Sequence, residues 1–208
     1  FIGDDDRYFP AAPYQGMPEQ GYTRMFERML DHDLIDVFLE VDARDILTVD
    51  DEHVTVQGKP YGGEVVYTGP LDELFDCDLG DLPYRSLDMR FETLAMDRFQ
   101  PVGTVNYTTS EDFTRITEFK IMTGQVKEGV TTIMREYPQP YERGRGMTPY
   151  YAIIEPQNEE LYRRYRDRVD HLTNFHPVGR LAEYRYYDMD GVTASALALS
   201  DELMAAHA

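Results

Sequence analysis

The stretch from Gly179 to Met189 holds the densest set of groups that could bind an anion. It contains three tyrosines, two arginines and two carboxylates. Guanidinium forks and phenol hydroxyls can hydrogen-bond a phosphate at several points at once, and a following helix start would add free N–H groups. The stretch is therefore a candidate site for a phosphorylated ligand. A charged end of an amphipathic strand is the alternative, and the pattern leaves both readings open.

A second candidate is Arg115, near the start of a predicted strand. Residues alternate between the two faces of a strand, so Arg115 and Thr117 share one face. Asn106 lies on the strand before it. An arginine on a sheet face is commonly a surface cross-strand partner, so the position alone does not decide between a ligand contact and a surface pair.

Other chemistries lack their residue patterns. The five histidines have no zinc-ligand spacing, and no metal site is predicted. No G-x-S-x-G elbow occurs. Cys77 stands between Asp76 and Asp78, and their charges should raise the pKa of its thiol, which argues against a nucleophilic cysteine. An arginine and tyrosine site stabilises charge, so a cofactor would have to supply covalent chemistry.

The amino-acid composition limits the classes of ligand and partner that the chain is expected to bind. The 208 residues carry 20 basic and 39 acidic side chains, giving a net charge of -19. This surplus argues against nucleic acid, and it means that an anionic ligand needs locally concentrated arginine. With 42% hydrophobic residues the chain can bury a core, and no apolar run reaches membrane-spanning length. The acidic start at Phe1 lacks a signal peptide and a methionine, so we expect a fragment.

The elements that must position these residues fall into three segments. In 1–83, a helix with an apolar stripe from Tyr22 to Leu30 is expected to face the core, followed by a strand over Leu34–Val41 and a hairpin near Val54. The strand Glu64–Pro70 leads into a helix, a pattern typical of the later part of a Rossmann-like layer. No G-x-G-x-x-G follows any strand.

The segment 84–148 has the alternation of an antiparallel sheet. Strands are predicted over 86–93, 104–109, 114–122 and 130–137, joined by short turns. The segment 149–208 returns to helices, at 159–172 and 188–206, around a short strand before Gly179. The predicted fold is mixed α/β, with an antiparallel sheet whose free face can line a cleft, beside Rossmann-like strands and helices.

An ordered set of motifs covers nearly the whole chain and resembles the bacterial UDP-galactopyranose mutases. The motifs are Arg7-Tyr8-Phe9, Tyr14-Gln15-Gly16, Gly21-Tyr22-Thr23, Val66-Tyr67-Thr68-Gly69-Pro70, Tyr84-Arg85-Ser86-Leu87, Asn106-Tyr107-Thr108, Phe113-Thr114-Arg115-Ile116-Thr117-Glu118, Glu136-Tyr137-Pro138, Pro149-Tyr150-Tyr151 and Gly179–Met189. Any one motif is weak evidence, whereas the ordered set is specific.

The resemblance implies a flavoenzyme that interconverts UDP-galactopyranose and UDP-galactofuranose for galactofuranose-containing glycans of the cell wall. In this family the N5 atom of reduced FAD attacks the anomeric carbon, UDP leaves, and the sugar recloses in the five-membered form. The resemblance also implies a cytoplasmic homodimer. Segments 1–83 and 149–208 would belong to the FAD domain, and 84–148 would bind substrate.

Site residues carry over by position. Arg115 matches the essential arginine that contacts the diphosphate and neutralises the leaving group. The resemblance implies substrate contacts for Tyr8, Asn106, Tyr151, Tyr186 and, in the same cluster, Asp188. It implies FAD contacts for Arg180 and for the helix start made of Met189, Asp190, Gly191, Val192 and Thr193.

The chain departs from the family pattern in several places. The dinucleotide-binding N-terminal part is absent, there is no tryptophan, Val178 stands where a second glycine is common, and Phe113 replaces a tyrosine. We therefore expect this chain alone to bind FAD poorly and not to turn over. Two alternatives stay open: a non-catalytic sugar-nucleotide-binding module, and a flavin oxidoreductase related to the amine oxidases.

Overall fold

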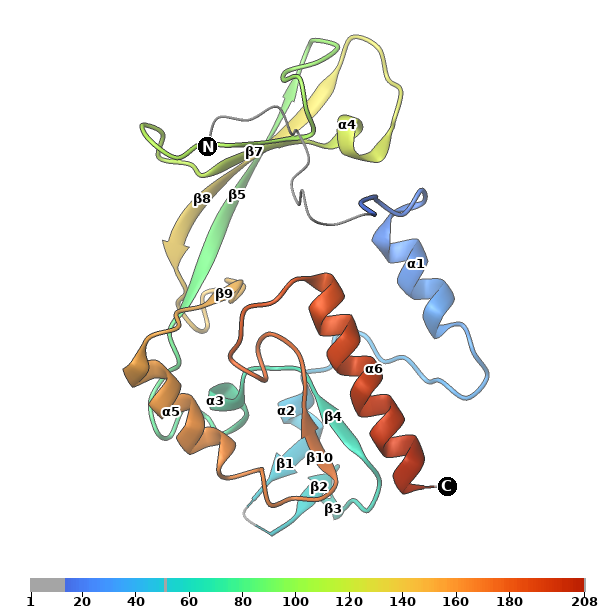
Figure 1. Ribbon diagram of the computed structural model, residues 1–208, viewed down its shortest axis with the longest axis vertical. Helices are drawn as coiled ribbons and strands as arrows, with labels where there is room; N and C mark the ends of the chain where they lie inside the picture. The colour runs from blue at the N-terminus through green and yellow to red at the C-terminus, as the bar shows by residue number, and fades with distance from the viewer. Residues whose placement is uncertain (1–13, 51, 208) are drawn as a thin grey trace. The chain divides into compact units, whose positions relative to one another are not determined.

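The computed structural model describes residues 14–50 and 52–207, and the chain divides into two compact units (Figure 1). The first unit holds the chain up to Leu39 together with Met89–Tyr137; the second holds Glu40–Asp88 and Pro138–Ala208. Strands and helices are mixed in the chain, which confirms the α/β class. The division of the chain into segments 1–83, 84–148 and 149–208 remains a prediction. In the described residues, no helix combines the length and apolar character that a bilayer span requires.

The first unit is built on antiparallel pairing. Strand β7 (Arg115–Glu118) pairs with β6 (Thr104–Asn106) on one side and with β8 (Thr131–Pro140) on the other, and β5 (Tyr84–Leu94) follows β8 in the sheet order. The antiparallel prediction is confirmed. The strand expected over 114–122 ends at Glu118, because helix α4 (Phe119–Thr123) follows at once and closes on Gly124, which has φ 70°.

Helix α1 (Gly21–Leu30) confirms the predicted helix, but the prediction that its stripe faces the core is wrong. None of its residues is buried, and Met29 is 65% exposed. The strand expected over Leu34–Val41 is also wrong: this segment has no strand, and Leu34 and Leu39 are more than 80% exposed. β-branched and apolar residues favour a strand only when a neighbouring strand completes its hydrogen bonds, and none among the described residues does so.

The second unit contains a continuous apolar core. Leu71, Tyr165 and Ala182 are fully buried, and each large apolar side chain of this kind contributes roughly 1.5–3 kcal/mol on burial. Helix α5 (Pro156–Arg166) starts with proline, which suits the first helical turn, where its missing N–H is not needed. Tyr165 reaches from α5 to the turn after α3 (Leu71–Leu74), donating to the Gly80 carbonyl at 2.8 Å and accepting from the Leu79 N–H.

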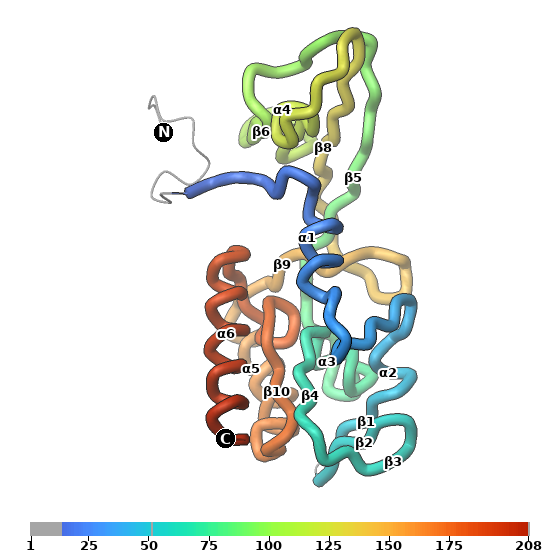
Figure 2. The backbone as a smooth tube through the Cα atoms, turned by 90° about the vertical axis from the view of Figure 1, so that its right-hand side faces the viewer, coloured from blue at the N-terminus to red at the C-terminus, as the bar shows by residue number. Residues whose placement is uncertain are grey.

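Two small sheets and a long helix complete this unit. The predicted hairpin near Val54 is confirmed as part of an antiparallel sheet, and strand β4 (Val65–Tyr67) pairs in parallel with β10 (Phe175–Pro177), a partner far along the chain. Figures 1 and 2 show α6 (Met189–Ala206) lying alongside β10 and β4. The remaining elements are α2 (Ala43–Ile46), β1 (Leu47–Val49), β2 (Val54–Val56), β3 (Lys59–Pro60) and β9 (Tyr151–Ala152).

Candidate anion-binding site

Arg115 is held across three strands of the first unit. The register places Asn106, Arg115 and Glu136 side by side on β6, β7 and β8. Arg115 Nε donates to Asn106 Oδ1 at 3.3 Å, and Arg115 Nη1 lies 3.6 Å from Glu136 Oε1. The Glu136 side chain is 8% exposed, whereas that of Arg115 is 30% exposed. Asn106 and Glu136 therefore hold the Arg115 guanidinium in place, while part of its side chain remains accessible to a ligand.

The strand that carries Arg115 is anchored by a buried carboxylate. Glu118 is fully buried and accepts hydrogen bonds from the Phe99 and Gln100 N–H groups and from the Thr131 hydroxyl, the last at 2.6 Å. Burial raises the pKa of Glu118, but the bonds from Thr131, Gln100 and Phe99 outweigh this and lower the pKa overall. The ionised carboxylate thus ties the loop at 99–100 to β7 and β8.

Arg180 occupies a different environment, in the second unit. Its guanidinium lies 5.2 Å from the ring centroid of Tyr151 and 4.9 Å from that of Tyr186. Its Nη2 donates to the Tyr150 carbonyl at 2.9 Å. The rings of Tyr151 and Tyr186 are 5.9 Å apart. The guanidinium therefore lies beside the adjacent rings, where cation–π attraction holds it, and three residues predicted as ligand contacts are brought together here.

The turn that presents Tyr186 is closed by Glu183. The Gly179 N–H donates to Glu183 Oε2 at 2.8 Å, and the Tyr187 hydroxyl donates to the same carboxylate. Gly179 has φ 102°, a conformation that only glycine adopts without strain. Burial, followed by the bond to Glu183, raises the pKa of Tyr187. Sequence composition indicated the cluster of charged and aromatic residues, but not the hydrogen bonds from Gly179 and Tyr187 to Glu183.

The start of α6 is open to solvent. Asp188 is the N-cap residue, and its side chain makes no capping hydrogen bond. Asp190 accepts from the Gly191 N–H at 2.9 Å, and the Thr193 hydroxyl donates to the Met189 carbonyl. Met189, Asp190, Gly191 and Thr193 are exposed and Val192 is half-buried. The five residues predicted to contact a cofactor therefore form one accessible helical turn.

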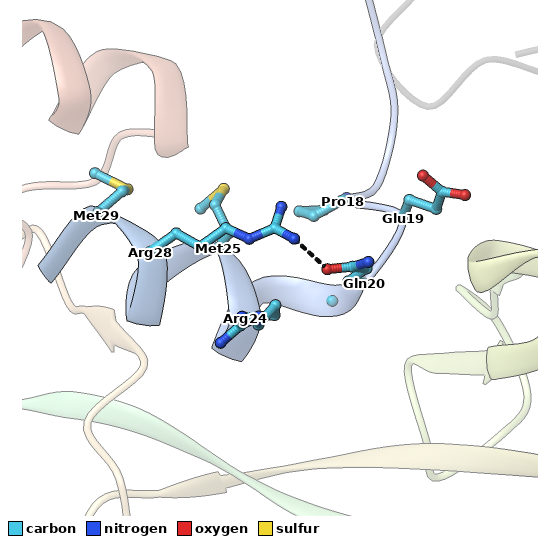
Figure 3. Close-up of a pocket in the computed structure, with 8 residues that line it drawn as sticks. Pro18, Glu19, Gln20, Arg24, Met25, Arg28 and Met29 are labelled. Atoms are coloured by element: carbon cyan, nitrogen blue, oxygen red, sulfur yellow. Dashed lines mark hydrogen bonds between the residues drawn. The ribbon is translucent and has the colours of Figure 1, made fainter. Parts of the chain in front are cut away.

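Hollows flank the tyrosine pair. One of about 480 Å³ is lined by Arg85 and Tyr151, and another of about 590 Å³ is lined by Arg185 and Tyr186. A third pocket, of about 380 Å³, lies at the start of α1 (Figure 3). Its Arg28 bonds Gln20, and no predicted site residue lines it, so we do not assign the site there.

Sequence reasoning named most of the residues in these two clusters, with two exceptions. Tyr8, a predicted substrate contact, lies outside the described residues. Glu136, the carboxylate beside Arg115, and Tyr150, whose carbonyl binds Arg180, received no role. Both could have been found only with the strand register and loop path, because neither is marked by spacing. The assigned ligand contacts themselves remain predictions.

Cys77 does not have the environment of a nucleophile. Burial raises the pKa of its thiol to about 12, with Asp81 and then Asp72 adding to the effect. A thiol of that pKa carries almost no thiolate at neutral pH. The predicted direction of the shift is confirmed, with burial rather than neighbouring charge as its main cause.

Comparison with known proteins agrees with the motif set. A family model described as UDP-galactopyranose mutase matches residues 1–186. The chain is 35% identical over 206 residues to a UDP-galactopyranose mutase of Mycoplasma pneumoniae, covering 98% of this chain and 51% of the relative. It is 34% identical to a probable UDP-galactopyranose mutase of Klebsiella pneumoniae over 96% of this chain and 48% of that protein.

A third relative is named for a different substrate. It is a dTDP-fucopyranose mutase of Escherichia coli, 29% identical over 187 residues, which cover 89% of this chain and 48% of that protein. The chain thus spans about half the length of the curated relatives it matches. Because the family model matches most of its residues, the chain belongs to the UDP-galactopyranose mutase family.

Proposed function

We propose that the protein containing this chain interconverts UDP-galactopyranose and UDP-galactofuranose. The observation that carries the proposal is the position of Arg115, which is fixed by Asn106 and Glu136 while 30% of its side chain stays exposed. A preorganised guanidinium stabilises a diphosphate leaving group without reorganising during the reaction. The curated relatives match only about half of their own length, so the activity of the whole protein is inferred from the family.

The other residues orient the substrate. Asn106 keeps Arg115 in place and offers its amide to the same ligand. In this proposal the hydroxyls of Tyr151 and Tyr186, which lie beside Arg180 in the second unit, donate to the phosphates, and Tyr8 and Asp188 belong to the same set. Hydrogen bonds to a diphosphate fix the attached sugar for reaction, and such positioning accounts for a large part of a catalytic barrier.

The proposed cofactor is FAD, whose reduced form would supply the nucleophile for the anomeric carbon. The first turn of α6 and Arg180 fit part of such a group. Exposed N–H groups at a helix start donate to acceptors, but Asp188 and Asp190 put negative charge there. This turn therefore suits an uncharged, carbonyl-bearing part of the cofactor better than its phosphates. Arg180, which makes no ion pair among the described residues, retains its positive charge for an acceptor.

The oligomeric state, the cellular location and the use of the product are inferred from the family resemblance alone. We propose a homodimeric, cytoplasmic enzyme that supplies galactofuranose for cell-wall glycans. Since the relatives are about twice as long as the matched region, we expect the 208-residue chain by itself to bind FAD poorly and to be inactive.

The deciding experiment replaces Arg115 in the flavin-loaded protein. We expect Arg115→Ala to lower the conversion of UDP-galactofuranose to UDP-galactopyranose by roughly 10³-fold, the larger effect seen when one charge-stabilising donor is removed. Flavin absorbance should be unchanged. Arg135→Ala is the matched control, because Arg135 lies on the neighbouring strand, paired with Glu92 instead. Product is measured by chromatography.

The same assay separates the two substrate classes named among the relatives. Conversion of dTDP-fucopyranose in preference to UDP-galactopyranose would reassign the substrate while keeping the mutase chemistry. Full activity in Arg115→Ala would remove the central role of this arginine. Reduction of the flavin by substrate, with no furanose product, would favour an oxidoreductase.

A further inference from the structure

Three potential metal ligands meet in the second unit, one on α3 and two on the turn that follows it. One ligand atom from each of Asp72, Cys77 and Asp81 lies within 4.8 Å of the other two. Cys77 Sγ lies 3.8 Å from Asp72 Oδ2. Asp72 is buried, Cys77 is half-buried and Asp81 is exposed. The set therefore runs from the interior to solvent, which gives an ion a path of entry.

The buried member of the set lacks a partner for one of its oxygens. Asp72 is 3% exposed, and its Oδ2 accepts from the Leu82 N–H at 2.8 Å. Its Oδ1 is buried and has no hydrogen-bond partner. The neighbouring N–H groups of Asp72 and Glu73 polarise the carboxylate, but neither bonds Oδ1 with ordinary geometry. No cationic side chain in the described part of the chain pairs with Asp72. A buried carboxylate without a cationic partner lowers the stability of the folded protein.

Ligand chemistry selects the kind of cation. Zn–S bonds of about 2.3 Å and Zn–O bonds of about 2.1 Å place sulfur and oxygen roughly 3.5 Å apart around a tetrahedral ion. The 3.8 Å between Cys77 Sγ and Asp72 Oδ2 needs only a small contraction to reach that value. A thiolate favours zinc over magnesium or calcium, which prefer oxygen ligands.

We propose that Asp72, Cys77 and Asp81 bind one divalent cation of the zinc type, with water as the fourth ligand. Formation of the metal–sulfur bond releases the Cys77 proton to solvent. Arg143 Nε, 3.6 Å from Asp81 Oδ1, gives up a weak exposed ion pair when the metal enters. The histidine spacing considered in the sequence could not reveal this set, because it contains no histidine.

The test titrates the 208-residue chain with Co²⁺ and then with Zn²⁺. We expect one equivalent of Co²⁺ to produce the ultraviolet charge-transfer absorption of a cobalt–thiolate bond, and Zn²⁺ to displace it. Cys77→Ser should abolish the absorption. Asp72→Asn and Asp81→Asn should each weaken Co²⁺ binding by roughly tenfold or more, on the scale of losses seen when groups supporting a metal site are changed.

Asp76→Asn is the matched control, because Asp76 adjoins Cys77 but is not one of the three ligands. Its Co²⁺ affinity should stay within about twofold of the parent. Asp81 is exposed, so Asp81→Asn remains informative if Asp72→Asn fails to fold. Absence of the charge-transfer absorption, or binding unaffected by Asp81→Asn, would overturn the proposal.

Discussion

The two arginines predicted as ligand contacts, one in each unit, are held by different forces. Arg115 lies on a sheet, beside the nearly buried carboxylate of Glu136. Arg180 lies beside two adjacent tyrosine rings and bonds a backbone carbonyl, and it makes no ion pair among the described residues. The ion pair with Glu136 compensates the charge of Arg115 within the protein. Rings and a carbonyl leave the charge of Arg180 uncompensated, so its attraction for an acceptor is not reduced by a carboxylate partner.

The most direct test of this difference between the arginines is to remove Glu136, the carboxylate that pairs with Arg115. In the flavin-loaded protein, we expect Glu136→Ala to lower kcat/KM by about 100-fold, because misplacing a catalytic group by about 1 Å costs that much. Glu136→Gln keeps an acceptor and should cost less. Glu92→Ala removes the partner of Arg135 on the same sheet and serves as control. Steady-state kinetics measure the ratio, and equal losses in Glu136→Ala and Glu92→Ala would contradict a specific role.

The next largest effect concerns stability of the sheet that carries Arg115. Glu118→Gln replaces an acceptor of three hydrogen bonds with a group that also donates, and we expect a loss of about 2 kcal/mol in the free energy of unfolding. The pKa of Glu118 is lower in the folded protein than in the unfolded chain. The ionised carboxylate therefore contributes its full stabilisation of the fold above the unfolded pKa of about 4.3. It is lost as the pH falls through the lower, folded value.

Urea unfolding at a series of pH values measures this difference. The gap between parent and Glu118→Gln should therefore be widest near neutral pH and should narrow in acid. Thr93, which bonds Thr132 on the exposed side of the sheet, supplies the control variant Thr93→Ala. A gap that grows in acid would show that Glu118 is protonated in the folded protein.

The smallest expected effect on stability distinguishes the contribution of the Tyr151 ring from that of its hydroxyl. Tyr151→Leu removes the ring, and we expect a loss of about 1 kcal/mol in unfolding free energy, the scale of a cation–π contact. Tyr151→Phe keeps the ring and should stay within about 0.5 kcal/mol, well below the cost of losing a ring contact. Thermal unfolding compares the two. Equal losses would mean that the hydroxyl, and not the ring, holds the cluster.

Local patterns in the sequence predicted the elements whose partners are close in the chain. The hairpin near Val54, the antiparallel sheet and helix α6 follow from alternation, turns and helical spacing. The segment after α1 was misread because Ile35 and Val37 favour a strand, but strand formation depends on a pairing partner that the pattern does not specify.

The same limit applies to the candidate site. Arg115 and the tyrosine-rich turn were marked by residue type and by family motifs. Glu136 belongs to one of the motifs but received no role, because its contact with Arg115 depends on the register between β7 and β8. Register is set by three-dimensional packing and turn geometry, and a shift of one residue would point Glu136 to the other face.

The parallel pairing of β4 with β10 has a consequence for the order of folding. Val65 meets Phe175, so the pair closes a loop of 110 positions that contains the whole of Met89–Tyr137. Near the ends of that insert, Arg90 lies 4.0 Å from the ring centroid of Tyr137. If the insert folds first, it nearly halves the loop left to close, which lowers the entropic cost by about 0.6 kcal/mol. The antiparallel sheet of the first unit thereby assists the pairing of β4 with β10.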